Sequence, residues 1–566
     1  MFENAANLAL GTLLCLGMVN QAAGGEFFVA PSGLPQGDGS RLQPWNFETA
    51  LADNTKTQNV NHVVQPGDTI WLRGGTYGYG SNVYVCSLNG ASNNPITVRQ
   101  YPGERAIIDG GISTTTLGGW TTFWGFEITC SNARTNTYAN RPAGLTLATL
   151  GHKAINLIVH DSGHPGIFGN PGEVYGCIVW GVGTYEYDNA TYFPTNPWVR
   201  GSGLYLQNNG VQGVSVSDNI SSRNFNAGMK AYAENSYASG FTFDGNIVFK
   251  NNGEGIENEC LNHSISNVVV MNNFTYRCRK TPMGYFSADV LAQHYNLVYS
   301  NNYEVGSPGA DAATLWLKRW RTLQVEHNTI VTISQTNEWS AGSGIGNGKG
   351  GKFLELYPST NLVLSYTINN NAYYGGVEQS ADWYSFTTIG GTNQYGMFYH
   401  TYQPFRYKYN SVPIPDGTNG LISFSAWTNA HGFDLNSTCT TNLPTANFVT
   451  LRTNKYERGR ANLVVFNWES NNTVNVDISS LGLAQGQRFE VRDVQNYFGT
   501  PVLTAKYDGA HSTISIPLTM TNVTAVTGGV ENNYAINPNI HTASLFNAFV
   551  VLPLAKSVFG KSPQHE

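Results

Sequence analysis

Short apolar runs, most of them opened by an asparagine, recur between about residues 203 and 372. The recurring asparagines are Asn219, Asn246, Asn273, Asn302, Asn328 and Asn371. Successive steps between them are 27, 27, 29, 26 and 43 residues. A period in the twenties, built from short strands without helical periodicity, predicts a β-solenoid. The longest step leaves room for an insertion between two turns of the coil.

A second set of positions recurs in step with the asparagines. Gly228, Gly255 and Gly284 each precede an asparagine of the first set by 18 residues. Each turn of the coil therefore contains at least two strands at a constant separation. Asparagine side chains stacked in successive turns can hydrogen-bond along the stack, as amide ladders do in other stacked sheets. We therefore assign the repeated asparagines a structural role.

Two segments near the amino terminus resemble a known family. They are Pro66–Tyr77, which reads PGDTIWLRGGTY, and Asn94–Val98, which reads NPITV. Both resemble the cap and first turns of right-handed parallel β-helix proteins, the pectate-lyase-like superfamily of polysaccharide lyases and hydrolases. The resemblance implies an all-β fold, a right-handed parallel β-helix, and a polysaccharide or oligosaccharide as the partner.

The alternation changes rhythm after about residue 447, where short antiparallel strands are predicted. They are Ala461–Trp468, Thr473–Ile478, Arg488–Val491, Thr513–Pro517 and Phe546–Leu552. This region resembles the β-sandwich that is appended to many bacterial glycan-active proteins. The expected domains are the β-helix with its cap at 25–375, an aromatic-rich connecting region at 376–440, and a C-terminal β-sandwich at 441–566.

Residues 1–24 have the pattern of a signal peptide. The apolar stretch Leu8–Val19 is too short to span a bilayer, but it fits the hydrophobic segment of a secretory signal followed by small residues. A buried first strand is the alternative. We expect a protein that is secreted or held at the cell surface or in the periplasm, without a membrane span.

Composition narrows the possible partners. Charged residues make up 12% of the chain against about 25% in a typical domain, and the net charge is −6 without a basic cluster, which argues against a nucleic-acid partner.

The six cysteines that follow Cys15 show no CxxC spacing, so we expect buried thiols. No cofactor or metal is expected, because a calcium site would need an aspartate cluster that the sequence lacks.

Strand alternation brings charged residues onto one outward face. With Met229 and Ile256 inward, Lys230 lies beside Glu257 on the neighbouring turn, about 4.8 Å away. Tyr232 and Glu259 form the next such pair. The expected outward set is Tyr205, Gln207, Lys230, Tyr232, Glu257 and Glu259, continuing to Trp316 and Lys318.

Two chemistries fit this face. Carboxylates at Glu257 and Glu259 are expected about 6.5–7 Å apart, close to the spacing with which inverting glycosidases admit a water. Alternatively, Lys230, or an arginine such as Arg279 or Arg319, removes the proton next to a uronate carboxylate, and Tyr232 protonates the leaving oxygen. Such lyase chemistry is what the resemblance implies. The expected substrate-binding residues are Tyr205, Gln207, Trp316, Lys318, Arg319 and Trp198.

The predicted function is that of an exported carbohydrate-active enzyme, a glycoside hydrolase or a polysaccharide lyase, which works in a groove on the β-helix. The alternative is a glycan-binding or structural protein of a cell surface or viral fibre. Lys230 and Glu257 would then form only an ion pair between turns, worth under about 1 kcal/mol at a surface. No oligomeric state is predicted.

Overall fold

The structure is a computed structural model of all 566 residues. It describes residues 24–52, 63–133, 141–149, 151–186, 198–208, 213–234, 237–261, 263–278, 280–284, 294–306, 313–333, 352–357, 365–375, 379–387, 393–401, 405–407, 421–526 and 539–554. The signal-peptide prediction lies outside these residues. None of the described helices is long and apolar enough to cross a membrane.

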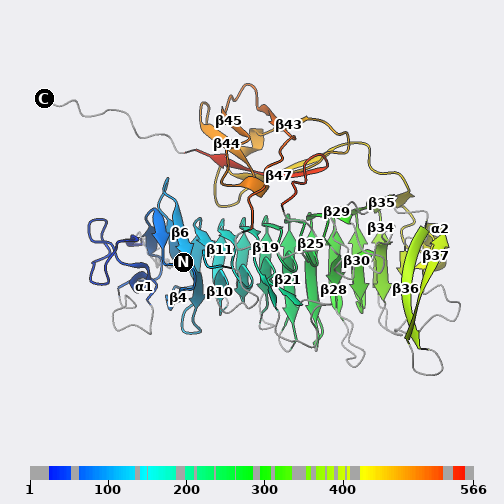
Figure 1. Ribbon diagram of the computed structural model, residues 1–566, viewed down its shortest axis with the longest axis horizontal. Helices are drawn as coiled ribbons and strands as arrows, with labels where there is room; N and C mark the ends of the chain where they lie inside the picture. The colour runs from blue at the N-terminus through cyan, green and yellow to red at the C-terminus, as the bar shows by residue number, and fades with distance from the viewer. Residues whose placement is uncertain are drawn as a thin grey trace, which may run out of the picture.

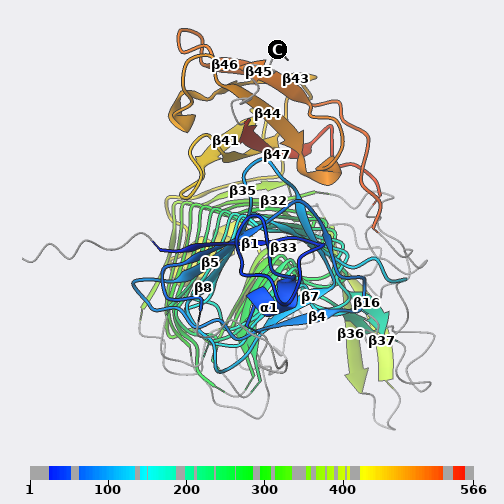
Figure 2. The same ribbon diagram turned by 90° about the vertical axis from the view of Figure 1, so that its left-hand side faces the viewer.

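Three long sheets wind around a common core and form a parallel β-helix, with the strands stacked along one axis (Figures 1 and 2). Sheet A consists of β1 Glu26–Val29, β2 Thr69–Leu72, β5 Ile96–Gln100, β8 Thr121–Trp124, β11 Lys153–Ile155, β14 Glu173–Tyr175, β19 Val214–Ser217, β22 Phe241–Asp244, β25 Ser266–Met271, β28 Tyr295–Ser300, β31 Thr322–Glu326 and β34 Ser365–Asn369.

Sheets B and C complete the coil. Sheet B consists of β3 Gly75–Tyr77, β6 Ala106–Asp109, β9 Glu127–Thr129, β12 Ile158–His160, β15 Ile178–Trp180, β20 Ile220–Ser222, β23 Ile247–Phe249, β26 Phe274–Tyr276, β29 Tyr303–Gly306, β32 Thr329–Thr332, β35 Ala372–Gly375 and β40 Thr438–Thr440. Sheet C consists of β4 Val83–Cys86, β7 Gly111–Thr114, β10 Leu145–Leu147, β13 Ile167–Gly169, β18 Leu204–Leu206, β21 Met229–Ala233, β24 Ile256–Cys260, β27 Thr281–Met283, β30 Ala313–Lys318, β33 Lys352–Tyr357, β38 Phe405–Tyr407 and the antiparallel β39 Leu421–Ile422. The predicted β-solenoid is confirmed.

The repeated asparagines form a buried ladder at the turn between sheets A and B. Asn246 donates from its backbone N–H and its side-chain amide to Oδ1 of Asn273, at 3.0 and 2.9 Å. Asn273 makes the same two bonds to Asn302, at 2.9 and 3.0 Å. The pattern continues to Asn371, whose amide ends on the carboxylate of Asp434 at 2.9 Å. The structural role predicted for these asparagines is confirmed.

The residue before each ladder asparagine has a positive φ. The values include +54° at Asp218, +70° at Gly245, +56° at Asn272 and +60° at His327. Only glycine and a few short polar residues adopt this left-handed conformation at little cost. This constraint explains why Asp, Gly, Asn and His occupy the position in the sequence repeat.

Short helices cover both ends of the coil. At the first end, α1 Phe47–Ala50 places Phe47 in the core, 3% exposed. At the other end, α2 Phe424–His431 buries Trp427 completely, and the Trp427 indole donates to Asp434 at 2.8 Å. Open ends of a solenoid expose core and strand edges, so such covers are needed.

The coil continues past residue 375, where the loss of the 27-residue period had placed its end. Strand β38 pairs with β33, and β40 pairs with β35. A hairpin of β36 Gln379–Thr387 and β37 Asn393–Thr401 is inserted before them and hides the period of the last turns. Another hairpin, of β16 Thr184–Glu186 and β17 Trp198–Arg200, is inserted between β15 and β18. Both hairpins project on the side where β4 and β7 lie (Figure 2).

The C-terminal domain is an antiparallel β-sandwich, as predicted. One sheet has the order β41 Phe448–Thr453, β42 Ala461–Phe466, β47 Phe546–Pro553, β44 Arg488–Asp493 and β45 Leu503–Lys506. The other pairs β43 Thr473–Asp477 with β46 Thr513–Pro517, and the short helices η2 Ser479–Leu481 and η3 Val494–Asn496 lie between strands. The six cysteines of the described chain are free thiols, five of them buried, as expected.

The sandwich lies on the outer face of sheet B (Figure 1). Apolar side chains from both parts form one buried cluster there. On the coil they include Ile178, Ile220, Ile247, Phe249, Phe274, Tyr276 and Tyr303, and on the sandwich Val464, Phe466, Phe546, Ala548 and Val550. Sheet B is thus apolar on both faces, which requires a permanent cover.

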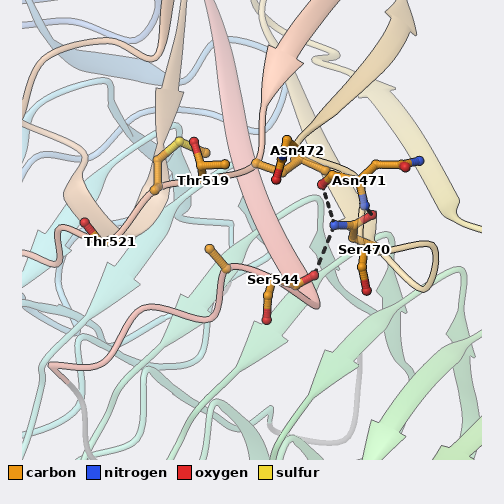
Figure 3. Close-up of a pocket in the computed structure, with 10 residues that line it drawn as sticks. Ser470, Asn471, Asn472, Thr519, Thr521 and Ser544 are labelled. Atoms are coloured by element: carbon orange, nitrogen blue, oxygen red, sulfur yellow. Dashed lines mark hydrogen bonds between the residues drawn. The ribbon is translucent and has the colours of Figure 1, made fainter.

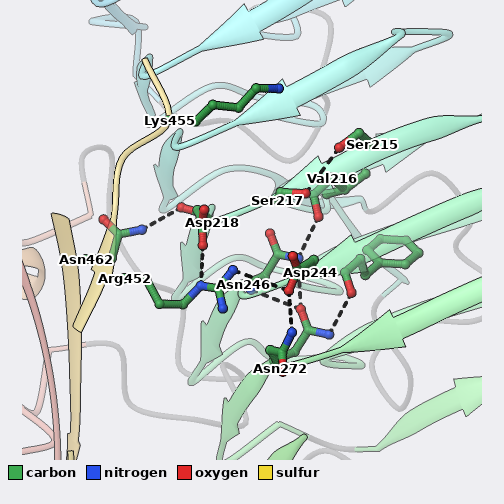
Figure 4. Close-up of polar contacts among 12 residues, drawn as sticks. Ser215, Val216, Ser217, Asp218, Asp244, Asn246, Asn272, Arg452, Lys455 and Asn462 are labelled. Carbon is green, nitrogen blue, oxygen red and sulfur yellow. Dashed lines mark hydrogen bonds and ion pairs between the residues drawn. The ribbon is translucent and has the colours of Figure 1, made fainter. Parts of the chain in front are cut away.

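Polar contacts at the edge of this apolar cluster fix the position of the sandwich (Figure 4). Arg452 contacts Asp218 at 2.5 Å and Asp244 at 3.3 Å, so that it bridges two successive turns. The side-chain amide of Asn462 donates to the carbonyl of Asp218 at 2.5 Å. Asp218 lies one residue before the ladder residue Asn219, and Asp244 lies two residues before Asn246. The docking therefore depends on the same spacing of turns as the ladder.

One carboxyl group is enclosed in the core of the coil. Glu304 is fully buried on β29 and accepts hydrogen bonds from the hydroxyls of Tyr299 and Thr281, the latter at 2.8 Å. Burial raises the pKa of Glu304 to about 7 from its ordinary value of 4.5. The fold therefore favours the protonated form of this side chain.

Replacing a central ladder residue tests the importance of the stack. Asn273→Ala would leave both donors of Asn246 and the carbonyl of Phe243 without partners in the interior. Each unpaired buried group costs roughly 1–3 kcal/mol, so we expect the free energy of unfolding to fall by at least about 3 kcal/mol in denaturant titrations. The exposed Asn442→Ala is the control. Equal midpoints for the two variants would contradict the role of the ladder.

Glu304 predicts a pH dependence of stability. The unfolded chain loses this proton near pH 4.5 and the folded chain near pH 7. The contribution is therefore fully present below about pH 4.5 and is lost as the pH rises through about 7, by roughly 3 kcal/mol in all. Glu304→Gln should abolish this part of the difference between unfolding free energies measured at about pH 5 and pH 8. Glu326→Gln, on the outer face of sheet A, should retain it; a Glu304→Gln profile like that of the unmodified chain would refute this account.

Candidate functional site

The candidate face lies on the outer side of sheet C and comprises Lys230, Tyr232, Glu257, Glu259, Trp316 and Lys318. In the β21–β24 ladder, Lys230 pairs with Glu257 and Tyr232 with Glu259, which is the register expected from the 27-residue step. Inward neighbours Met229 and Ile256 are at most 1% exposed. The repeat therefore brings these four side chains together.

Tyr205 and Gln207 adjoin this face on the previous turn. Tyr205 pairs with Lys230, and the Lys230 ammonium lies 5.8 Å from the Tyr205 ring centroid and 4.2 Å from that of Tyr232. The side-chain amide of Gln207 donates to the Tyr232 carbonyl at 3.0 Å. Two aromatic rings thus hold the ammonium group, and Gln207 supports the strand that carries it.

Lys230 and Glu257 form a buried ion pair. Their Nζ and Oε1 atoms are 2.8 Å apart, and the Glu257 side chain is only 3% exposed. Burial opposes the charge of Lys230, but the carboxylates around it, foremost Glu257, raise its pKa above the ordinary value. A lysine must be uncharged to remove a proton. Lys230 is therefore suited to holding charge in place and poorly suited to the expected role of a base.

Glu259 is the acid of the carboxyl pair. Burial and then the neighbouring charge of Glu257 raise the pKa of Glu259 well above its ordinary range, which favours its protonated form. Burial also raises the pKa of Glu257, while Lys230 and a hydrogen bond to Glu259 act to lower it. This contact differs from the expected separation of about 6.5–7 Å, because the rise of a strand fixes Cα positions and not the direction in which long side chains lean.

A glycine lies at the position between Glu259 and Lys318 in the stack of turns. Asn258 pairs with Met283 and Met283 with Leu317, so Gly284, the residue after β27, lies at the level of Glu259 and Lys318. Gly284 has φ +84°, and a Cβ there would lie 2.2 Å from the Lys318 carbonyl oxygen and 2.8 Å from a ring carbon of His294. The backbone therefore requires glycine here, and this position places no side chain between the carboxyl group and the amine.

Lys318 is the cation whose protonation is easiest to change. Burial lowers the pKa of Lys318 to about 8. The negative charge of Glu259 opposes this shift, and the positive charge of Lys280 adds to it. The ammonium groups of Lys318 and Lys280 lie 4.3 and 3.8 Å from the Trp316 ring centroid. A fraction of Lys318 is therefore neutral near pH 7 and can accept a proton.

Three members of the site were missed in the sequence. Glu254 and Lys280, whose side chains approach to 3.7 Å, lie in turns just before strands, where alternation assigns no direction. Glu355 is completely buried and pairs with Trp316 in the next turn. The long insertion between β30 and β33 hid that pairing, which only a correct alignment of the two strands would have revealed.

Two expected binding residues lie outside the strands of sheet C. Arg319 lies in the turn after β30, with φ +58°. Trp198 belongs to β17, and its side chain lies outside the described residues. Their assignment to substrate binding stays a prediction.

The described residues contain a further pocket and no cluster of candidate metal ligands. Within those residues, no three His, Cys, Asp or Glu side chains are placed to hold a metal ion. A cavity of about 240 Å³ opens in the sandwich and is lined by uncharged side chains, among them Asn471, Asn472, Thr519 and Ser544 (Figure 3). It offers no acid or base.

Comparison with known proteins bears on the fold. Residues 27–264 match a family model described as a Pel9A-like, right-handed β-helix region. The match confirms the resemblance to right-handed parallel β-helix proteins and gives the hand of the coil. No protein of curated function matches the sequence.

Several solved structures are similar at low identity. A pectate lyase, Pel9A, is 17% identical with a TM-score of 0.35, over 56% of this chain and 80% of that chain. A rhamnogalacturonan lyase is 15% identical with a TM-score of 0.34, over 62% and 82%. XylC in complex with xylose is 10% identical with a TM-score of 0.38, over 93% and 100%. These values carry no conclusion about a reaction.

The ion pair makes a prediction that a double variant can test. Lys230→Met would leave Glu257 buried without its counter-charge, and we expect the unfolding free energy to fall by about 3–5 kcal/mol. Adding Glu257→Gln removes the uncompensated charge and should restore most of the loss. Denaturant titrations of the single and double variants provide the measurement; a double variant as unstable as Lys230→Met alone would show that the pair is not coupled.

Proposed function

We propose that this protein is a polysaccharide lyase that cleaves a uronate-containing chain on the candidate face by β-elimination. Lys318 is the base and Glu259 the acid. The observation that carries the proposal is their arrangement: a buried amine with a lowered pKa and a buried carboxyl group with a raised pKa, two turns apart on one face with Gly284 at the position between them. The elimination needs a base that can lose its proton and an acid that can keep one, and burial shifts the pKa values of Lys318 and Glu259 in these directions.

The reaction balances without water. Neutral Lys318 takes the proton from the carbon next to the uronate carboxylate, and the electrons of that bond form a carbon–carbon double bond. The bond to the glycosidic oxygen breaks, and this oxygen takes the proton of Glu259. The products are a chain with a new hydroxyl end and a chain with an unsaturated sugar, while the enzyme is left with an ammonium and a carboxylate.

Other residues of the face support substrate binding in this proposal. The fixed ammonium groups of Lys230 and Lys280 stabilise the uronate carboxylate as negative charge develops beside it. The half-buried rings of Tyr205, Tyr232 and Trp316 offer surfaces against which sugar rings pack.

Hydrolysis fits this geometry less well. An inverting glycosidase needs about 6.5–9.5 Å between its carboxyl groups to admit a water, whereas Glu257 and Glu259 share a hydrogen bond. A retaining enzyme needs an accessible nucleophile, and Glu257 is 2% exposed and held by Lys230. Elimination requires neither feature.

We further propose that the protein is exported and acts at or outside the cell surface. The apolar segment Leu8–Val19 and the low content of charged residues support this location. Detection of the protein in culture medium or in a periplasmic fraction, with residues 1–24 removed, tests it.

Substitution of the two residues tests the mechanism. Lys318→Met keeps the length of the side chain but cannot accept a proton, and Glu259→Gln cannot supply one. Each should lower kcat on a uronate polysaccharide by about 10²–10⁴-fold with little change in KM, while Lys506→Met on the exposed surface of the sandwich should leave both unchanged. In the unmodified enzyme, the rate should rise with pH up to about 8, as Lys318 loses its proton.

The readouts separate the possible functions. Ultraviolet absorbance from an unsaturated sugar, together with new reducing ends, supports elimination. Reducing ends without absorbance would establish a hydrolase and refute the roles given to Lys318 and Glu259. Binding without cleavage across a panel of uronate and neutral polysaccharides would favour the glycan-binding protein instead.

A further inference from the structure

A second group of aromatic and basic side chains lies on another side of the coil. Trp71 on β2, Arg99 on β5 and Trp124 on β8 pair with one another in successive turns of sheet A, and their neighbours Ile70, Val98 and Phe123 point into the core. We call these three residues the Arg99 stack. The Arg99 guanidinium carbon lies 5.2 Å from the Trp71 ring centroid and 4.0 Å from that of Trp124.

Arg99 has no partner for its charge among the described residues. No carboxylate within that part of the chain forms an ion pair with it, and its Nε atom is buried without a hydrogen-bond partner. Burial lowers the pKa of Arg99, and only the more distant charge of Glu457 acts in the opposite direction. A desolvated cation without a hydrogen-bonded counter-ion is costly, so a ligand that supplies one gains affinity.

Neighbouring carboxylates are already engaged elsewhere. Glu457 accepts the indole N–H of Trp124 at 2.8 Å and contacts Arg460 at 3.2 Å. Glu26 accepts the indole N–H of Trp71 at 3.2 Å. These bonds hold the two indole rings on either side of Arg99 and leave the donors of the guanidinium unused.

Aromatic residues extend the stack in both directions. Tyr101 lies 5.8 Å from Trp71, edge to face, and Tyr456 of the sandwich lies 5.5 Å from Trp124 in the same manner. All five side chains of this extended surface are half-buried, so each presents an accessible part. Arg73 and Arg41 lie 5.3 and 5.6 Å from the Tyr101 ring, and Arg73 also pairs with Glu104 at 2.8 Å.

We propose that the Arg99 stack is a second glycan-binding site, which takes the carboxylate of an acidic saccharide on the edge of the Arg99 guanidinium. Because Trp71 and Trp124 flank the Arg99 guanidinium from the turns on either side, a ligand approaches it from the outer side of sheet A, between the two indole rings. A planar anion that accepts two parallel N–H bonds, such as a uronate carboxylate, matches this approach. Tyr101 and Tyr456 then contact the sugar rings on either side.

This site does not depend on the proposed reaction. It belongs to sheet A, whereas the candidate face belongs to sheet C, so the two surfaces lie on different sides of the coil. A chain bound at the Arg99 stack is held to the protein without occupying Lys318 and Glu259. The stack would anchor the enzyme to its polymer.

Titration calorimetry with oligogalacturonate tests the site. The full chain carrying Lys318→Met, which cannot turn the ligand over under the proposal, is compared with the same chain carrying Arg99→Gln in addition. We expect the number of oligosaccharides bound per protein to fall by one, whatever the candidate face contributes. Arg99→Lys keeps the charge but not the planar fork, and should weaken this binding at least tenfold.

Matched controls fix the interpretation. Arg488→Gln removes an exposed arginine of the sandwich and should change neither the number of sites nor their Kd. The carboxyl-reduced oligosaccharide should not bind at the stack. Thermal unfolding verifies that each variant is folded. An unchanged number of sites and an unchanged Kd in Arg99→Gln, or an equal loss in Arg488→Gln, would overturn the proposal.

Turnover separates this proposal from the proposed reaction. Loss of the site in Arg99→Gln, with turnover retained when Lys318 is present, would support the second site. Absence of turnover in every variant would refute only the proposed reaction.

Discussion

The hydrogen bonds between stacked asparagines set the spacing on which the rest of the structure depends. Each ladder residue bonds both the side-chain amide and the backbone of its neighbour, so a turn cannot shift by one residue without breaking two bonds. A shift by one residue would also exchange the inner and outer faces of every strand in that turn. The ladder thereby fixes which side chains meet on the outside of these turns, including Lys230 beside Glu257.

Burial then gives the outward charges their chemical character. On an open surface, the lysines and glutamates of the candidate face would be ordinary ion pairs with ordinary pKa values. Glu257 is only 2% and Lys318 only 9% exposed, so burial disfavours the charged form of each side chain. The charges nearest to each group then decide how far its pKa shifts. Lys230 is paired with Glu257 and remains charged, whereas burial lowers the pKa of Lys318 to about 8, so that it loses part of its charge near neutral pH. One register thus produces two lysines of different function.

The features that depend on periodicity could be predicted from the sequence, and those that depend on side-chain direction could not. The asparagine repeat revealed the coil and its register, and the change of rhythm after residue 447 revealed the sandwich. The contact between Glu257 and Glu259 was not predictable, because two residues on one face of a strand can lean together or apart. Lys280 and Glu254 lie in turns, for which alternation is silent. Position alone predicts Lys230 as the base, whereas its protonation depends on Glu257, whose carboxylate lies 2.8 Å from the Lys230 ammonium.

The three-sided coil also explains why functional surfaces are found where they are. Sheet B is apolar on its outer side and is covered by the sandwich, so it cannot meet a polymer. Sheets A and C each collect basic and aromatic residues in one region of their outer faces. The sandwich contributes Tyr456 and Glu457 to the edge of sheet A, where they adjoin Trp124. Its docking, fixed by Arg452 across two turns, therefore completes the Arg99 stack while it covers the apolar face.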